Sequence, residues 1–248
     1  MKALIIAFSM YSKIPMPKVS WTQKSMKNAL CFFPLIGMVI GGFVLLEYYL
    51  FQYFQLGVIF RTAIFIITPL VITGGIHLDG FIDTMDARRS YQEKEKKLAI
   101  LQDPHIGAFA LICSLIYFFI SLAFMSEITS NSIWLVAIGF VLSRALSGLG
   151  VVTLKGAKAN GLVATFADMA RKPLVQAMMI LYIILSIVGM LLISPVGGIA
   201  TSMIGILTFL YYRYISYKEF GGITGDLAGY FIQICELAIL IMAVILER

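Results

Sequence analysis

The segment GGIHLDGFIDTMD, residues 74–86, closes a long apolar run and carries three aspartates and a histidine. Asp79, Asp83 and Asp86 are spaced i, i+4 and i+7, which on a helix confines them to an arc of roughly 60°. Three like charges on one face repel each other, and carboxylates beside lipid are costly. A hard divalent cation would relieve this repulsion, and Mg²⁺ prefers oxygen ligands. The segment therefore predicts a metal site at the end of a membrane helix.

The composition indicates an integral membrane protein. Of 248 residues, 60% are hydrophobic and 13% charged, whereas about 25% are charged in an ordinary soluble domain. Cys31, Cys113 and Cys235 lie in apolar segments without paired spacing, so we interpret them as buried hydrophobes. The net charge of +6 comes without a basic run interleaved with aromatics, which argues against a nucleic-acid partner and for membrane topology.

Apolar runs long enough to cross a bilayer, about 20 residues each, predict an all-α polytopic bundle within a single domain, residues 1–248. The sixth of seven runs is expected to be short, because Pro195 and Gly197–Gly198 interrupt it. The apolar stretch Ala3–Tyr11 is too short to span and is expected to be interfacial or re-entrant. The seven expected spans are residues 30–51, 58–76, 107–126, 132–152, 174–194, 196–212 and 228–246.

Basic residues concentrate before the first span and in alternate connections, which by the positive-inside rule predicts a cytoplasmic N-terminus. Residues 1–28 then form a cytoplasmic or interfacial segment, and residues 77–106 form a cytoplasmic catalytic loop that includes an amphipathic helix over 87–102. We expect a multi-pass protein of the cell (inner or plasma) membrane with its site facing the cytoplasm. The same side receives both histidines and all six aspartates: Asp79, Asp83, Asp86, Asp103, Asp168 and Asp226.

Two further motifs carry polar residues to this side. In LQDPHIGAFA, residues 101–110, Asp103 is either a plain helix cap or a further carboxylate near the aspartate face. In EFGGITGDLAG, residues 219–229, Thr224 and Gly225 open a helix whose free amides suit a phosphate, and Asp226 can add a metal ligand. The glycines of this motif also suit close helix contact in a membrane.

The charged residues inside or next to the spans have open roles. Arg144 either holds a phosphate or neutralises a carboxylate, because a buried arginine must pair. Glu47 and Glu236 are expected to be structural, each with a polar partner in the bundle. Lys155 and Lys158 either neutralise an anionic substrate or follow the positive-inside rule, and Asp168 with Arg171 is expected to form a surface ion pair.

At these residues the chain resembles the cobalamin synthase, or adenosylcobinamide-GDP ribazoletransferase, family. The resemblance covers essentially the whole chain, and its most specific part is a His-x-Asp-Gly-x-x-Asp-Thr-x-Asp signature. Ala87 stands where the family usually has glycine, and His105 stands where arginine is expected. The matching segments are FSMYSKIPMP (8–17), FFPLIGMVIG (32–41), GGIHLDGFIDTMDA (74–87), DPHIGAFA (103–110) and GGITGDLAG (221–229).

The resemblance implies a Mg²⁺-dependent transfer that joins adenosylcobinamide-GDP to α-ribazole or α-ribazole 5′-phosphate and releases GMP. This is the last step of nucleotide loop assembly in cobalamin (vitamin B12) biosynthesis. On this hypothesis Asp79, Asp83, Asp86 and Asp226 hold one or two Mg²⁺ ions on the pyrophosphate. His77 or one of the aspartates takes the ribose proton, and Arg144 stabilises the transferred phosphate or the leaving GMP. The sequence does not fix the oligomeric state, so a homo-oligomer stays open.

Two other functions compete. A membrane CDP-alcohol phosphotransferase also uses helically spaced aspartates and Mg²⁺, and the string from Asp83 to Arg88 echoes part of its Asp-x-x-Asp-Gly-x-x-Ala-Arg signature. Here no glycine follows Asp86, and the Ala-Arg pair comes too soon. A transporter would fit seven spans, but it more often carries ionisable groups near the bilayer midplane than on one side.

Overall fold

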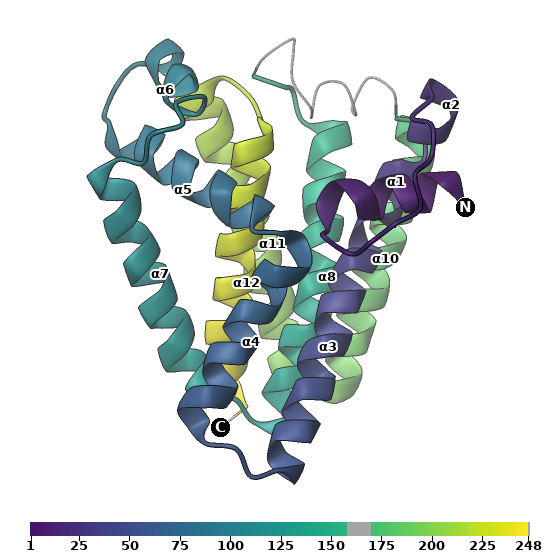
Figure 1. Cartoon of the computed structure of the whole chain (residues 1–248), viewed down its shortest axis with the longest axis vertical. Helices are drawn as coiled ribbons and strands as arrows, with labels where there is room; N and C mark the ends of the chain where they lie inside the picture. The colour runs from purple at the N-terminus through teal and green to yellow at the C-terminus, as the bar shows by residue number, and fades with distance from the viewer. Residues whose placement is uncertain (158–169, 248) are drawn as a thin grey trace.

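The computed structural model describes residues 1–157 and 170–247, and these residues fold into a helical bundle (Figure 1). The expectations for Lys158 and Asp168 concern residues outside these ranges. The helices are α1 Lys2–Tyr11, α2 Gln23–Met26, η1 Ala29–Phe32, α3 Phe33–Tyr53, α4 Val58–Thr73, α5 Ile76–Arg89, α6 Lys94–Ile100, α7 Ala108–Ser126, α8 Ser130–Thr153, α10 Lys172–Ile193, α11 Pro195–Phe220 and α12 Gly225–Leu246.

The structure confirms a polytopic membrane bundle. Among the described residues, six helices are long and apolar enough to cross a bilayer, and the bent pair of α4 and α5 brings the number to seven if it counts as one broken span. Most residues of α8 are buried, and it packs against α3, α10 and α12. The outer helices α7 and α10 expose large apolar side chains such as Phe119 and Leu192, which suits contact with lipid.

The predicted second span ends earlier than expected and turns sharply. α4 stops at Thr73, and Gly74 and Gly75 adopt left-handed backbone conformations with φ of +67° and +77°. Glycine enters this region without the steric cost of a Cβ atom. The chain therefore bends by 96° between α4 and α5. Figure 1 shows α5 crossing the end of the bundle, beside α6 and opposite the C-terminus. We call this end of the bundle the polar end.

The expectation of a short, interrupted sixth span is wrong. α11 runs without a break over 26 residues. Pro195 occupies its first position, where a missing N–H costs no hydrogen bond. The Ser194 side chain caps the helix by accepting a hydrogen bond from the Gly197 N–H at 3.1 Å. Gly198 lies against the backbone of Met190, so its lack of a side chain lets α11 pack closely on α10.

Candidate functional site

The three aspartates of the opening segment all lie on α5. The helix is continuous from Ile76 to Arg89, so the spacing of Asp79, Asp83 and Asp86 places them along one face. Asp79 is exposed, and Asp83 and Asp86 are half-buried. Partial burial of Asp83, together with the negative charges of Asp79, Asp226 and Asp86, raises the pKa of Asp83 to about 6. The face therefore concentrates negative charge from two helices at the polar end.

Asp226 reaches this face because α12 begins directly against α5. A Cβ atom on Gly80 would lie 2.7 Å from the Asp226 carbonyl oxygen, and one on Gly229 would lie 3.0 Å from the His77 carbonyl oxygen. Both positions need glycine for this close approach. Thr224 is the N-cap of α12, and its hydroxyl accepts a hydrogen bond from the Leu227 N–H at 3.2 Å.

The carboxylates fit a magnesium ion in their chemistry but are not already gathered around one. Asp79, Asp83, Asp86 and Asp226 supply oxygen donors, which Mg²⁺ prefers, and partial burial together with the three neighbouring carboxylates raises the pKa of Asp83. Over residues 1–157 and 170–247, no group of three or more His, Cys, Asp or Glu side chains is arranged to hold a metal ion. These side chains would therefore have to converge when an ion binds.

His77 lies inside the bundle, two residues before Asp79. Its side chain is buried, its ring centroid lies 5.9 Å from that of Phe33, and its Nε2 atom has no hydrogen-bond partner. Burial, with a smaller contribution from the charge of Arg144, lowers the pKa of His77 well below its usual value. His77 is therefore neutral at physiological pH. It lines a cavity of about 240 Å³ together with Asp79 and Asp226.

Arg144 neutralises a carboxylate, which is one of the two roles that the sequence left open. Its Nη1 atom lies 2.7 Å from Glu236 Oε1 and also donates to the Phe140 carbonyl oxygen at 2.9 Å. Glu47 likewise has a polar partner, since it accepts a hydrogen bond from the Thr68 hydroxyl at 2.6 Å. Both intramembrane glutamates are thus paired, as expected.

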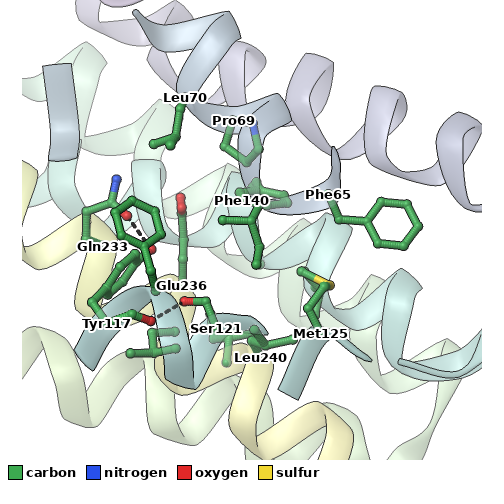
Figure 2. A pocket seen from close by; sticks show the side chains of 16 residues that line it. Phe65, Pro69, Leu70, Tyr117, Ser121, Met125, Phe140, Gln233, Glu236 and Leu240 are labelled. Carbon is green, nitrogen blue, oxygen red and sulfur yellow. Dashed lines mark hydrogen bonds between the residues drawn. The ribbon is translucent and has the colours of Figure 1, made fainter. Parts of the chain in front are cut away.

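A small cavity lies beside Glu236 (Figure 2). The side chains of Tyr117 and Gln233 both line this cavity, and the Tyr117 hydroxyl donates a hydrogen bond to Gln233 Oε1. The cavity volume is about 50 Å³. This is room for very few water molecules, so the cavity is far too small for a substrate.

The interpretation of Asp103 as a helix cap is wrong, because Gly107 occupies the N-cap position of α7. Asp103 instead closes an exposed turn, where it accepts hydrogen bonds from the backbone N–H and ring Nδ1 of His105 at 2.9 and 2.7 Å. These bonds lower the pKa of Asp103. The same connection does approach the aspartate face at Gly107. A Cβ atom on Gly107 would overlap the Asp86 carboxylate, so the two residues are in close contact.

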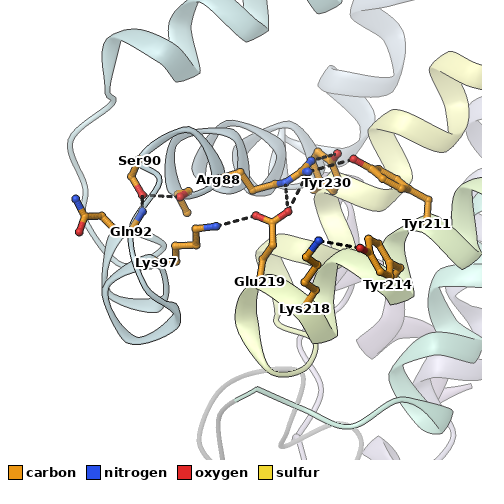
Figure 3. A network of polar contacts seen from close by, with 10 residues as sticks. Arg88, Ser90, Gln92, Lys97, Tyr211, Tyr214, Lys218, Glu219 and Tyr230 are labelled. Atoms are coloured by element: carbon orange, nitrogen blue, oxygen red, sulfur yellow. Dashed lines mark hydrogen bonds and ion pairs between the residues drawn. The ribbon is translucent and has the colours of Figure 1, made fainter.

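Sequence reasoning missed a polar network that fixes the C-terminal end of α5 (Figure 3). Arg88 donates from Nε and Nη2 to Glu219 Oε1 at 3.2 and 3.1 Å, and from Nη1 to the Tyr230 hydroxyl at 2.8 Å. Lys97 donates to the other Glu219 oxygen at 2.8 Å. The network joins α5, α6, α11 and α12. The local sequence does not predict this network, because Arg88 and Glu219 are 131 residues apart.

Comparison with known proteins identifies relatives along the whole chain. A model of the family described as cobalamin-5-phosphate synthase matches residues 3–244. An adenosylcobinamide-GDP ribazoletransferase of Lachnoclostridium phytofermentans is 49% identical over 247 residues, which is 100% of this chain and 95% of that protein. No solved structure matches the chain.

More distant relatives carry the same name. The adenosylcobinamide-GDP ribazoletransferase of Clostridium botulinum strain Alaska E43 is 34% identical over 95% of this chain and 94% of its own length. That of Treponema denticola is 34% identical over 97% of this chain and 96% of its own length. The aspartate face and the glycine contact between α5 and α12 lie inside the matched region. The chain therefore belongs to the cobalamin-5-phosphate synthase family.

Proposed function

We propose that this chain is an adenosylcobinamide-GDP ribazoletransferase. It would join adenosylcobinamide-GDP to α-ribazole or α-ribazole 5′-phosphate, forming adenosylcobalamin or its phosphate and releasing GMP. The observation that carries this proposal is the full-length similarity to relatives of that name, one of which is 49% identical to this chain in sequence. The concentration of carboxylates at one end of the bundle supports it, because this reaction acts on a pyrophosphate.

In this reaction the ribose hydroxyl of the acceptor attacks the phosphorus next to the cobinamide. The bond between that phosphorus and the bridging oxygen breaks, and GMP leaves with the oxygen. Such transfers depend on charge neutralisation and in-line positioning more than on covalent catalysis. We propose that Asp79, Asp83, Asp86 and Asp226 hold one or two Mg²⁺ ions, which when bound would neutralise the pyrophosphate.

The hydroxyl proton needs an acceptor within hydrogen-bond reach. His77 is a candidate because it is neutral and its Nε2 atom lacks a partner. An aspartate of the α5 face is the other candidate. Arg144 is bound to Glu236, so we assign it to holding α8 against α12 and not to direct phosphate contact.

We propose that the polar end faces the cytoplasm of the cell (inner or plasma) membrane. The basic residues of the chain support this orientation, because Lys2, Lys27, Arg88 and Lys97 all belong to segments at this end. The first turn of α12, which begins at Gly225, would then lie on the cytoplasmic side of the membrane.

A turnover assay tests the proposal. Purified protein in detergent or liposomes receives adenosylcobinamide-GDP and α-ribazole, with either Mg²⁺ or EDTA, and GMP and corrinoid products are separated by chromatography. The proposal predicts GMP and a base-on corrinoid spectrum only with Mg²⁺. CMP release from a CDP-alcohol would instead indicate the CDP-alcohol phosphotransferase reaction, and substrate flux into vesicles without chemical change would indicate a transporter.

A further inference from the structure

Two cavities flank the first turn of α5 and share part of their walls. The outer cavity has a volume of about 620 Å³ and is lined by Ser9, Ser12, Lys13 and Gly74 among others. The inner cavity, of about 240 Å³, is the one that His77 lines. Met10, Ile76 and Asp79 belong to both walls. The first aspartate of the α5 face therefore stands where the two cavities meet.

Lys13 is an exposed residue that lines the outer cavity, and its backbone and side-chain carbons lie against the end of α4. Its backbone N–H donates to the Ile72 carbonyl oxygen at 2.7 Å, which ties the chain after α1 to the end of α4. Its side-chain carbons lie over Gly74, where a Cβ atom would be 2.6 Å from Lys13 Cγ. In the part of the chain that the structure describes, the Lys13 ammonium forms no ion pair or hydrogen bond. Such a cation is suited to an anionic ligand.

The inner cavity has the character of a site for a flat aromatic group. Its walls are mostly apolar or aromatic, including Tyr11, Phe33 and Ile232. The buried Nε2 atom of His77 has no partner in the protein and is therefore available to a ligand. Apolar walls with a few polar groups are typical of small-molecule pockets, which usually measure about 300–1,000 Å³. The two cavities together fall in this range, whereas a corrinoid is too large for either.

We infer that the two cavities form the binding site of the nucleoside acceptor, with its aromatic base in the inner cavity, its ribose at Asp79, and a 5′-phosphate beside Lys13 in the outer cavity. This inference rests on the proposed function and deepens it. It makes Lys13 a specificity residue that favours the phosphorylated acceptor, α-ribazole 5′-phosphate, over free α-ribazole. It also brings the ribose hydroxyl to the carboxylates that the reaction needs.

The test compares both acceptors on the wild type, Lys13→Gln and the control Lys18→Gln, which removes an exposed lysine outside both cavities. Acceptor affinity is measured by calorimetry without donor or Mg²⁺, and KM is measured in turnover. The wild type should bind α-ribazole 5′-phosphate more tightly than α-ribazole. Loss of one contact to a charged group should weaken binding of the phosphorylated acceptor by about 10- to 100-fold in Lys13→Gln. Free α-ribazole should bind all three proteins alike.

Equal binding of the two acceptors by the wild type would overturn the inference, as would a Lys13→Gln variant that weakens both acceptors equally or neither. If the wild type turns over normally and Lys13→Gln matches it, only this inference fails. If the wild type neither binds an acceptor nor releases GMP, the proposed function fails with it.

A second variant tests the inner cavity. Ser147→Leu adds bulk to its wall at a buried position. It should raise KM for both acceptors at least 10-fold and leave KM for adenosylcobinamide-GDP unchanged. Thermal unfolding in detergent shows that the variant is folded, and Ser147→Ala, which adds no bulk, is the matched control. A rise in the KM of the donor alone would overturn the assignment of this cavity to the acceptor.

Discussion

Replacing Gly80 by alanine should slow the reaction by moving Asp226 away from the α5 face. A Cβ atom at position 80 would lie 2.7 Å from the Asp226 carbonyl oxygen and 2.9 Å from its Cα atom, whereas ordinary contact begins at 3.4 Å. The backbones must therefore separate by about 0.7 Å, and a displacement of about 1 Å in a catalytic group can cost about 100-fold in rate. We expect kcat to fall by about 10- to 100-fold.

The contact with the α12 backbone should cost about 1–3 kcal/mol of stability, and the helix preference of alanine over glycine, about 1 kcal/mol, offsets part of this cost. Gly42→Ala in α3 is the matched control, since a Cβ atom there meets nothing within 4 Å. The assay measures GMP release at saturating substrates over a Mg²⁺ titration, with thermal unfolding in detergent alongside. A folded Gly80→Ala protein with kcat within twofold of the Gly42→Ala control would refute the close contact of α12 with α5 as the means of placing Asp226.

Three further changes probe other parts of the structure. Arg144→Met leaves Glu236 buried and uncompensated, so it should destabilise the protein by about 3–5 kcal/mol, whereas the Arg144→Met/Glu236→Met pair should recover most of that loss. Without metal, the unfolding free energy should fall as pH rises from the ordinary aspartate pKa of 3.8 to about 6, because the folded chain retains a proton on Asp83 that the unfolded chain releases. Asp83→Asn should make the unfolding free energy less dependent on pH in this range. Glu219→Gln weakens the hydrogen bonds from Arg88 and Lys97 and should cost about 1–3 kcal/mol. Denaturant unfolding in detergent measures all three.

A double variant no more stable than Arg144→Met would show that the buried pair is not the source of the loss. A pH slope unchanged by Asp83→Asn would show that another group carries the proton. For Glu219→Gln the control is Glu93→Gln at an exposed site, and equal stability of the two variants would contradict a structural role for the network.

The sequence predicted the parts of this architecture that depend on local pattern. The spacing of Asp79, Asp83 and Asp86 is a property of one helix, so it defines a face before any tertiary contact is known. The long apolar runs likewise predicted the spans, because a bilayer demands about 20 such residues. Pro195 led to a wrong prediction for the sixth span. Proline occurs at the first position of a helix as well as at helix breaks, and here it begins α11.

The rest required the three-dimensional structure. Arg144 and Glu236 are 92 residues apart, and nothing near either residue specifies the partner. The right-angled turn at Gly74 and Gly75 could be suspected from the glycines, but its angle of 96° follows from their left-handed backbone and from the contact of α5 with α12. Lys13 is one of several lysines before the first span in the sequence, and the structure alone places its side chain against Gly74.

The most direct test of the aspartate face is the rate of GMP release by wild-type protein and Asp83→Asn across a Mg²⁺ titration, with adenosylcobinamide-GDP and α-ribazole as substrates. We predict that wild-type activity rises with Mg²⁺ and disappears in EDTA, whereas Asp83→Asn unfolds at or above the wild-type temperature and releases no GMP at any Mg²⁺ concentration. A folded Asp83→Asn protein that keeps wild-type activity at ordinary Mg²⁺ would contradict the assignment of this face to the metal.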